Sequence, residues 1–280
     1  YADSWNKAIS LADEIINSGQ YSLDQEPITA WSNSSTANIS DETIWYALFS
    51  DAVAGNSYKR PTSFNYSHYL ATDGNRGQIH SRVPWNQFTW SHSALQEIGW
   101  FDEELNTTPL ALGDKRYQQL HYRLEGNRGN DNDDPRVYEM QYTKITEPHL
   151  WCDKYYRAPL GIHTNIPLFK LSEVYLTRAI LSYLNGNTAQ ATSDINVIRS
   201  RAGLEPLANV TEQDIHHERL KELAFEMDWV IYKISLQMDI TAGDRDPAEN
   251  RNPVITYPYE DFYYLINLNE LDFKEQNERE

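Results

Sequence analysis

The stretch between residues 165 and 226 constrains the fold most, because its apolar residues recur at helical spacing between clear breaks. The apolar face after Pro167 consists of Leu171, Val174, Tyr175, Ile180, Leu181 and Leu184. Asn165 is suited to cap this helix, and Pro167 to sit in its first turn, where a missing N–H costs no hydrogen bond. Asn185-Gly186-Asn187 ends the pattern, since Gly and Asn readily take a left-handed backbone. We therefore expect a helix that begins near Pro167 and ends before Gly186.

Two further helices follow closely in the sequence. Thr188 can cap the second, Gly203 ends it, and its inward face would be Ala191, Ile195, Ile198 and Ala202. The short connection makes the first two helices antiparallel neighbours, and this pair has the dimensions of a tetratricopeptide-like repeat of about 34 residues. Thr211 and Asp214 resemble a capping box that opens the third helix, whose apolar residues are Ile215, Leu220, Leu223 and Ala224.

The beginning of the chain resembles the second helix of another such repeat. Its apolar and small residues are Tyr1, Trp5, Ala8, Ile9, Ala12, Ile15 and Ile16, and the pattern ends at Ser18-Gly19. The sequence opens inside this element without an initiator Met, so we expect it to lack an N-terminal part.

The predicted fold class is mainly α, with tetratricopeptide-like helix pairs, long irregular loops and minor β structure. We expect one domain over residues 1–280 with four parts. These are a repeat-like helix (1–24), a loop-rich insert (25–164), the helical hairpin plus third helix (165–236) and a C-terminal wrap (237–280). Partial alternation between residues 114 and 146 predicts a small hairpin or extended arm.

Composition excludes several classes of protein. Lys plus Arg at 24 against Asp plus Glu at 41 gives a net charge of −17, which disfavours binding to nucleic acid or to anionic lipid. No apolar run approaches the length that spans a bilayer. The lone cysteine, Cys152, rules out an internal disulfide framework.

Aromatic residues gather between residues 52 and 100, interleaved with Asn, Asp, Arg and Gln. A sugar presents a weakly polar C–H face that stacks on such rings and a hydroxyl rim that pairs with such polar side chains. The alternative is that the rings pin a long irregular segment to the helical scaffold, because large rings dominate burial. For any one ring this alternative is the commoner outcome, whereas for the group we expect at least one ring to contact a ligand.

Six motifs in order carry a resemblance to a known family. They lie at residues 18–23, 41–45, 113–116, 166–176, 195–204 and 218–226. The longest read I-P-L-F-K-L-S-E-V-Y-L, I-N-V-I-R-S-R-A-G-L and E-R-L-K-E-L-A-F-E. In this order they resemble the SusD/RagB family of nutrient-binding outer-membrane lipoproteins. Residues 177–180, 226–233 and 266–270 depart from the family pattern, which indicates a divergent member.

The resemblance implies a non-catalytic protein at the surface of a Bacteroidota-like outer membrane. It would bind an oligosaccharide or other nutrient and deliver it to a TonB-dependent SusC-like transporter, and its lipid anchor is absent from this sequence. The family places part of its glycan site between the second and third of these motifs. The ligand-binding residues implied there are Tyr66, Tyr69, Asn75, Arg76, Trp85 and Trp90. We expect no cofactor and no nucleic-acid partner.

Other functions remain open. A helical-repeat scaffold that binds only proteins would share the helices without needing the loop aromatics. A glycoside hydrolase would need two carboxylates across the scissile bond, and Glu218, Glu222 and Glu226 share a helical face. We favour a structural role for them, clamping Arg199, Arg201 or Arg219 between helices.

The acidic loop Asp131–Asp134 has oxygen ligands for calcium but lacks the pattern of an EF-hand. We therefore favour an exposed turn over a metal site.

Overall fold

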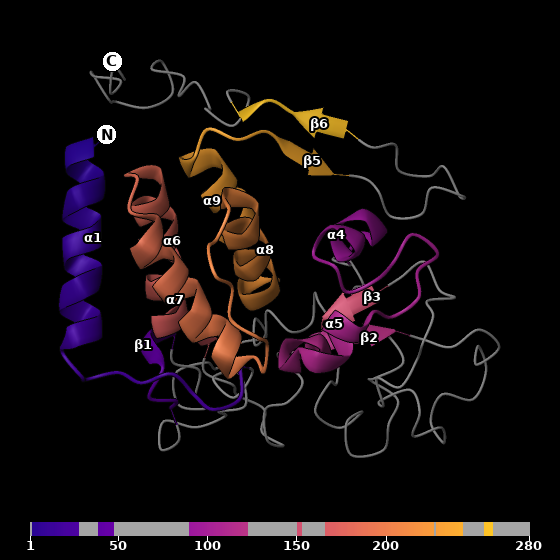
Figure 1. The fold of residues 1–280 in the computed structure, drawn as a ribbon, viewed down its shortest axis with the longest axis horizontal. Coiled ribbons are helices and arrows are strands. Elements are labelled where there is room, and N and C mark those ends of the chain that lie inside the picture. Colours follow the sequence, from indigo (N-terminus) through magenta and orange to yellow (C-terminus); the bar gives the residue numbers. More distant parts are fainter. Residues whose placement is uncertain are drawn as a thin grey trace, which may run out of the picture.

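The computed structural model describes residues 2–27, 39–47, 90–122, 150–152, 166–226, 228–242 and 255–259. Helices dominate these parts, as the sequence predicts (Figure 1). They are α1 (Ala2–Asn17), α4 (His92–Glu97), α5 (Pro109–Gly113), α6 (Leu171–Leu184), α7 (Thr188–Arg201), α8 (Glu212–Leu223) and α9 (Asp228–Ser235), with the 3₁₀ helix η4 (Lys115–Gln119). Among the described helices, none is both long and apolar enough to cross a membrane.

The helical hairpin is confirmed. Helix α6 contacts α7, α1 and α8, and Figure 1 shows these helices side by side in one layer. The predicted inward residues are buried: Leu171, Val174, Ile180, Leu181, Ala191, Ile195, Ile198 and Ala202. Tyr175 and Leu184 are partly buried and pack against the same core.

The predicted start of the hairpin is wrong. Residues Ile166–Lys170 form strand β4, which pairs antiparallel with β1 (Thr43–Ala47), and α6 begins only at Leu171. Pro167 therefore lies opposite Tyr46 in a two-stranded sheet instead of in a first helical turn. The local sequence favours the helix, but pairing with a distant strand satisfies the backbone of these residues and overrides that preference.

The helix ends follow local chemistry closely. Gly203 has φ +82° after α7. The Thr211–Asp214 capping box at α8 is confirmed. Helix α7 is capped by Asn187, one residue before the expected Thr188. Helix α8 ends at Leu223 and α9 begins at Asp228, and the apolar pattern of the sequence does not indicate this interruption.

Two further sheets are small. Strand β2 (Leu120–Tyr122) pairs with β3 (Leu150–Cys152). The second half of the predicted arm lies outside the described residues. Strand β5 (Ile240–Ala242) pairs with β6 (Ile255–Tyr257) within the predicted C-terminal wrap. In Figure 1, α4, α5, β2 and β3 lie together beside α8, forming a second group next to the helical layer.

Candidate functional site

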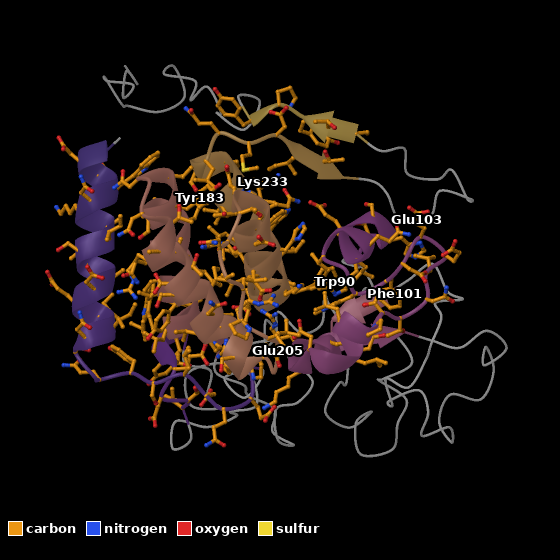
Figure 2. The ribbon with its side chains drawn as sticks, in the orientation of Figure 1. Trp90, Phe101, Glu103, Tyr183, Glu205 and Lys233 are labelled. Carbon is orange, nitrogen blue, oxygen red and sulfur yellow. The ribbon has the colours of Figure 1, made fainter. Side chains whose placement is uncertain are left out.

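Trp90 is the one predicted ligand-binding residue within the described parts of the chain. Tyr66, Tyr69, Asn75, Arg76 and Trp85 lie outside them, as does the acidic loop Asp131–Asp134. Figure 2 shows Trp90 between α8 and the α4–α5 group. The site can therefore be built from the contacts of Trp90 outward.

Trp90 belongs to a group of packed rings, here called the aromatic cluster: Trp90, Trp100, Phe101, Tyr117 and Phe225. The ring centroid of Trp90 lies 5.7 Å from that of Trp100 and 5.5 Å from that of Phe225, and the Trp90–Phe225 pair is edge to face. Tyr117 packs edge-on against Trp100 at 5.6 Å. Such tilted and edge-on geometries are the favoured arrangements of aromatic pairs.

Burial bears on the role expected for Trp90. The residue is 4% exposed, so it offers almost no ring face to a sugar. Ligand contact by Trp90 stays a prediction, and its packing favours the pinning alternative for this particular ring. The aromatic cluster thus holds the C-terminal end of the aromatic-rich segment against the scaffold.

The aromatic cluster is connected to a buried acid–base unit. Asp114 Oδ1 accepts hydrogen bonds from the backbone N–H and the Nε of Arg116, both at 2.9 Å, and Oδ2 accepts from Nη2 at 2.9 Å. The indole Nε1 of Trp100 donates to the same Oδ2 at 3.3 Å. The side chain of Arg116 is 2% exposed and that of Asp114 is fully buried.

Arg116 in turn reaches α8. Its Nη2 lies 2.7 Å from Glu218 Oε2, and its Nη1 lies 3.6 Å from Glu222 Oε2. Glu218 and Glu222 are one helical turn apart and therefore share a face. The motif around Asp114 and the motif on α8, distant in the sequence, are thus two halves of one ion-pair network.

Helix α7 closes the network from the other side. Arg199 Nη1 lies 2.7 Å from Glu218 Oε1, and Arg201 pairs with both Glu222 and Glu42, the latter at 2.6 Å. The predicted clamping of Arg199 and Arg201 is confirmed by these contacts.

The third predicted arginine has a different partner. Arg219 pairs with Asp228 of α9 at 2.5 Å, and its guanidinium lies 4.3 Å from the centre of the Tyr232 ring. It therefore joins α8 to α9 instead of taking part in the α7–α8 contacts.

Lys170 and Glu226 complete the buried network. Their Nζ and Oε1 atoms are 2.9 Å apart, and the side chains are 2% and 9% exposed. We call the whole set the charge cluster: Glu42, Asp114, Arg116, Lys170, Arg199, Arg201, Glu218, Lys221, Glu222 and Glu226. The expectation that Glu226 shares a helical face with Glu218 and Glu222 is wrong, because α8 ends at Leu223. All three carboxylates considered for hydrolysis are nevertheless engaged by cations.

The pKa shifts follow from burial and pairing. Burial opposes ionisation of Glu218, but Arg116 and Lys221 outweigh it and lower its pKa. At Glu42 burial prevails over Arg201 and Lys170 and raises the pKa. Burial disfavours the charge of Arg116, yet Glu218 and Asp114 raise its pKa, so the guanidinium stays ionised.

Neither cluster is visible as such in the sequence. Asp114, Arg116 and the α8 carboxylates stand out as motifs, but only the fold reveals that they face each other. The sequence does show aromatic residues on both sides of the Asp114–Arg116 motif, Trp100 before it and Tyr117 after it. These two rings pack against each other in the aromatic cluster. Among the described residues, no group of three His, Cys, Asp or Glu side chains could hold a metal ion.

The described fold is mainly helical, built on packed helix pairs that a buried ion-pair network holds together. A model of the SusD family matches residues 17–230, and the chain belongs to that family. A stretch of 64 residues is 44% identical to the starch-binding protein SusD of Bacteroides thetaiotaomicron, covering 22% of this chain and 11% of that protein.

Solved structures share the fold at low identity. A putative sugar binding protein from Bacteroides vulgatus is 18% identical with a TM-score of 0.59, over 92% of this chain and 50% of that one. Surface glycan-binding protein A from Bacteroides thetaiotaomicron, in complex with laminarihexaose, is 18% identical with a TM-score of 0.53, over 80% and 48%. The chain thus spans about half the length of these structures.

Proposed function

We propose that this protein captures an oligosaccharide at the cell surface without cleaving it. The observation that carries the proposal is the family match over residues 17–230, which covers most of the scaffold and all of the charge cluster. Relatives described as binding starch and laminarihexaose support a glucan-like ligand. A SusC-like TonB-dependent transporter in the outer membrane would receive the cargo, as the family resemblance implies.

The chemistry of the described carboxylates supports binding without hydrolysis. A glycosidase needs one carboxyl group that donates a proton and a second that attacks or activates water. Glu218 and Glu222 are 2% and 1% exposed in their side chains and are paired with arginines. Side chains held in this way cannot reach a sugar, so the α8 carboxylates act as structural counter-ions.

Within this proposal, each predicted ligand-binding residue has a role. Tyr66, Tyr69 and Trp85 would stack on sugar faces, and Asn75 and Arg76 would pair with hydroxyl groups. Trp90 would contribute through its packing in the aromatic cluster. A protein-binding helical scaffold is the second candidate, and it would make these loop residues dispensable.

The test is titration of the protein with maltoheptaose and laminarihexaose, using calorimetry and an assay for new reducing ends. We expect saturable binding to at least one glucan and no new reducing ends. Trp85→Ala should weaken binding at least tenfold, whereas Trp5→Ala, which lies on α1 and outside the aromatic-rich part of the sequence, should leave the affinity within twofold. Release of new reducing ends would contradict the capture role, and equal affinities of both variants would contradict the assigned residues.

A further inference from the structure

The turn that ends α8 has an unusual backbone. Phe225 has φ +63°, in the left-handed region, where a side chain with a Cβ crowds the backbone and Gly is the usual residue. Ala224 before it has already left the helix, with φ −55° and ψ +139°. The backbone N–H of Glu226 donates to the carbonyl of Leu223 at 3.1 Å and closes the turn. A bulky residue in this conformation requires fixed contacts on both sides.

Those contacts point in two directions. The Phe225 ring meets Trp90 edge to face, at 5.5 Å and an angle of 64°. The next side chain, Glu226, pairs with Lys170 at 2.9 Å. Phe225 therefore packs in the aromatic cluster, whereas the next residue, Glu226, binds Lys170 at the start of α6.

The left-handed turn at Phe225 directs the side chains of Phe225 and Glu226 to these two different contacts. Glu226 follows Glu222 by four residues, so a continuous helix would keep both carboxylates on one face. The turn takes Glu226 out of that row and brings it to Lys170, at the junction of β4 and α6. Lys170 is held there by the pairing of its backbone with Thr43 of β1. The ion pair thus ties the turn to the β1–β4 sheet.

We infer that the Phe225–Glu226 turn is a positioning element that sets where Trp90 sits, the one described residue of the predicted ligand-binding set in the aromatic-rich segment. The inference rests on the proposed function, because that segment carries the predicted ligand-binding residues. In this inference Phe225 and Glu226 themselves make no contact with the ligand. They act by holding the indole of Trp90 in place against Trp100.

A spectroscopic readout reports this placement without any ligand. Two indoles 5.7 Å apart and tilted by 56° couple their excited states, which produces an exciton couplet in the far-ultraviolet circular dichroism. The couplet is isolated as the difference between wild type and Trp90→Phe. Its amplitude depends on the distance and angle between Trp90 and Trp100, so it is sensitive to displacement of Trp90.

Phe225→Gly is the decisive variant, because Gly accepts the left-handed backbone and removes only the ring. We expect the couplet to fall to less than half and the affinity for the bound glucan to fall at least tenfold. Phe225→Tyr should restore both, and Glu226→Gln should weaken both in the same direction. Ile195→Val is the control, because it trims the hairpin core and leaves the turn intact; its couplet and affinity should match wild type.

The outcomes separate the inference from the proposed function. An unchanged couplet in Phe225→Gly would overturn the inference, and a lost couplet with unchanged affinity would overturn the link to the ligand. If wild type binds neither maltoheptaose nor laminarihexaose, the proposed function fails together with the expected effect on affinity. The couplet would still decide whether the turn positions Trp90.

Discussion

Single ionised side chains in the interior carry large free-energy consequences, because a charge removed from water must be matched by a partner. Arg116 is fully enclosed and serves carboxylates from two segments of the chain. Its neighbour Lys115 forms an ion pair with Glu26 at the surface, with side-chain exposures of 40% and 55%. Adjacent positions therefore offer a buried ion pair and an exposed one within the same motif.

Arg116→Met should destabilise the protein by about 3–5 kcal/mol, since Asp114 would remain buried without its cation and Glu218 would lose one of its cations. Lys115→Met should cost less than about 1 kcal/mol. Both values come from urea unfolding. If Arg116→Met is too unstable to purify, the double variant Arg116→Met with Glu218→Gln should recover part of the loss. Equal effects of the two single variants would contradict the role assigned to the charge cluster.

Glu173 makes stability depend on pH. Burial, and next the carboxylates of Asp228 and Glu226, raise its pKa from 4.5 to about 7, against the opposing effect of Arg219. Between these pH values the folded state binds more protons than the unfolded one, so this contribution to stability is full below pH 4.5 and is lost as pH rises through 7.

Glu173→Gln should therefore be more stable than wild type by about 3 kcal/mol at pH 8 and by less than about 1 kcal/mol at pH 5. The measurement is urea unfolding at both pH values. Glu14→Gln, on the exposed side of α1, is the matched control and should change little at either pH. A difference between Glu173→Gln and wild type that is the same at both pH values would disprove the assignment.

At the scale of elements, the junction of α7 with the α5 group depends on a close approach of two backbones. Gly203 has φ +82°, and a Cβ added there would lie 3.2 Å from the carbonyl oxygen of Gly113. Gly186, which ends α6, has a similar φ of +80°, but an added Cβ would meet nothing within 4 Å. The two glycines share a backbone conformation and differ in their surroundings.

Gly203→Ala should cost more than Gly186→Ala by about 1 kcal/mol, because both acquire left-handed strain of roughly 1–2 kcal/mol and only the first also meets a backbone atom. Thermal and urea unfolding of the two variants provide the comparison. Equal losses would mean that the segment at Gly113 moves aside at no cost.

Local chemistry predicts the elements that depend on it. The α6–α7 hairpin, the glycine after α7 and the Thr211–Asp214 box are all readable, because their determinants lie within a few residues. Strand β4 is not, since its partner β1 is far away in the sequence. The same holds for the pairing of Arg116 with Glu218: charge and spacing mark each motif, whereas their contact is a property of the fold.

The whole molecule joins a helical layer to a second group of elements through the charge cluster and the aromatic cluster. The chain carries a net charge of −17, whereas the sugars proposed as its ligands are neutral. Like charges repel across such a surface, and added salt screens that repulsion. Salt should therefore affect the stability of the protein and its affinity for a neutral ligand differently.

Raising NaCl from about 0.02 M to about 0.5 M should increase the melting temperature while leaving the affinity for a neutral oligosaccharide within twofold. Calorimetric titration and thermal unfolding at both concentrations test this expectation. A sulfated oligosaccharide of the same length should bind more weakly at low salt and recover at high salt. A strong salt dependence with the neutral sugar would point to a charged contact in recognition.

The ion pairs between Arg116 and the carboxylates of α8 also restrict which mutations the gene can accept. A codon change that removes Arg116 leaves Asp114 buried without its cation, and a change at Glu218 removes one of the carboxylates that hold the guanidinium, so each step alone costs stability. A lineage that alters one of the two positions first passes through a less stable intermediate before the second change can compensate. The order of mutations, and not only their sum, therefore decides which descendants of this protein can exist.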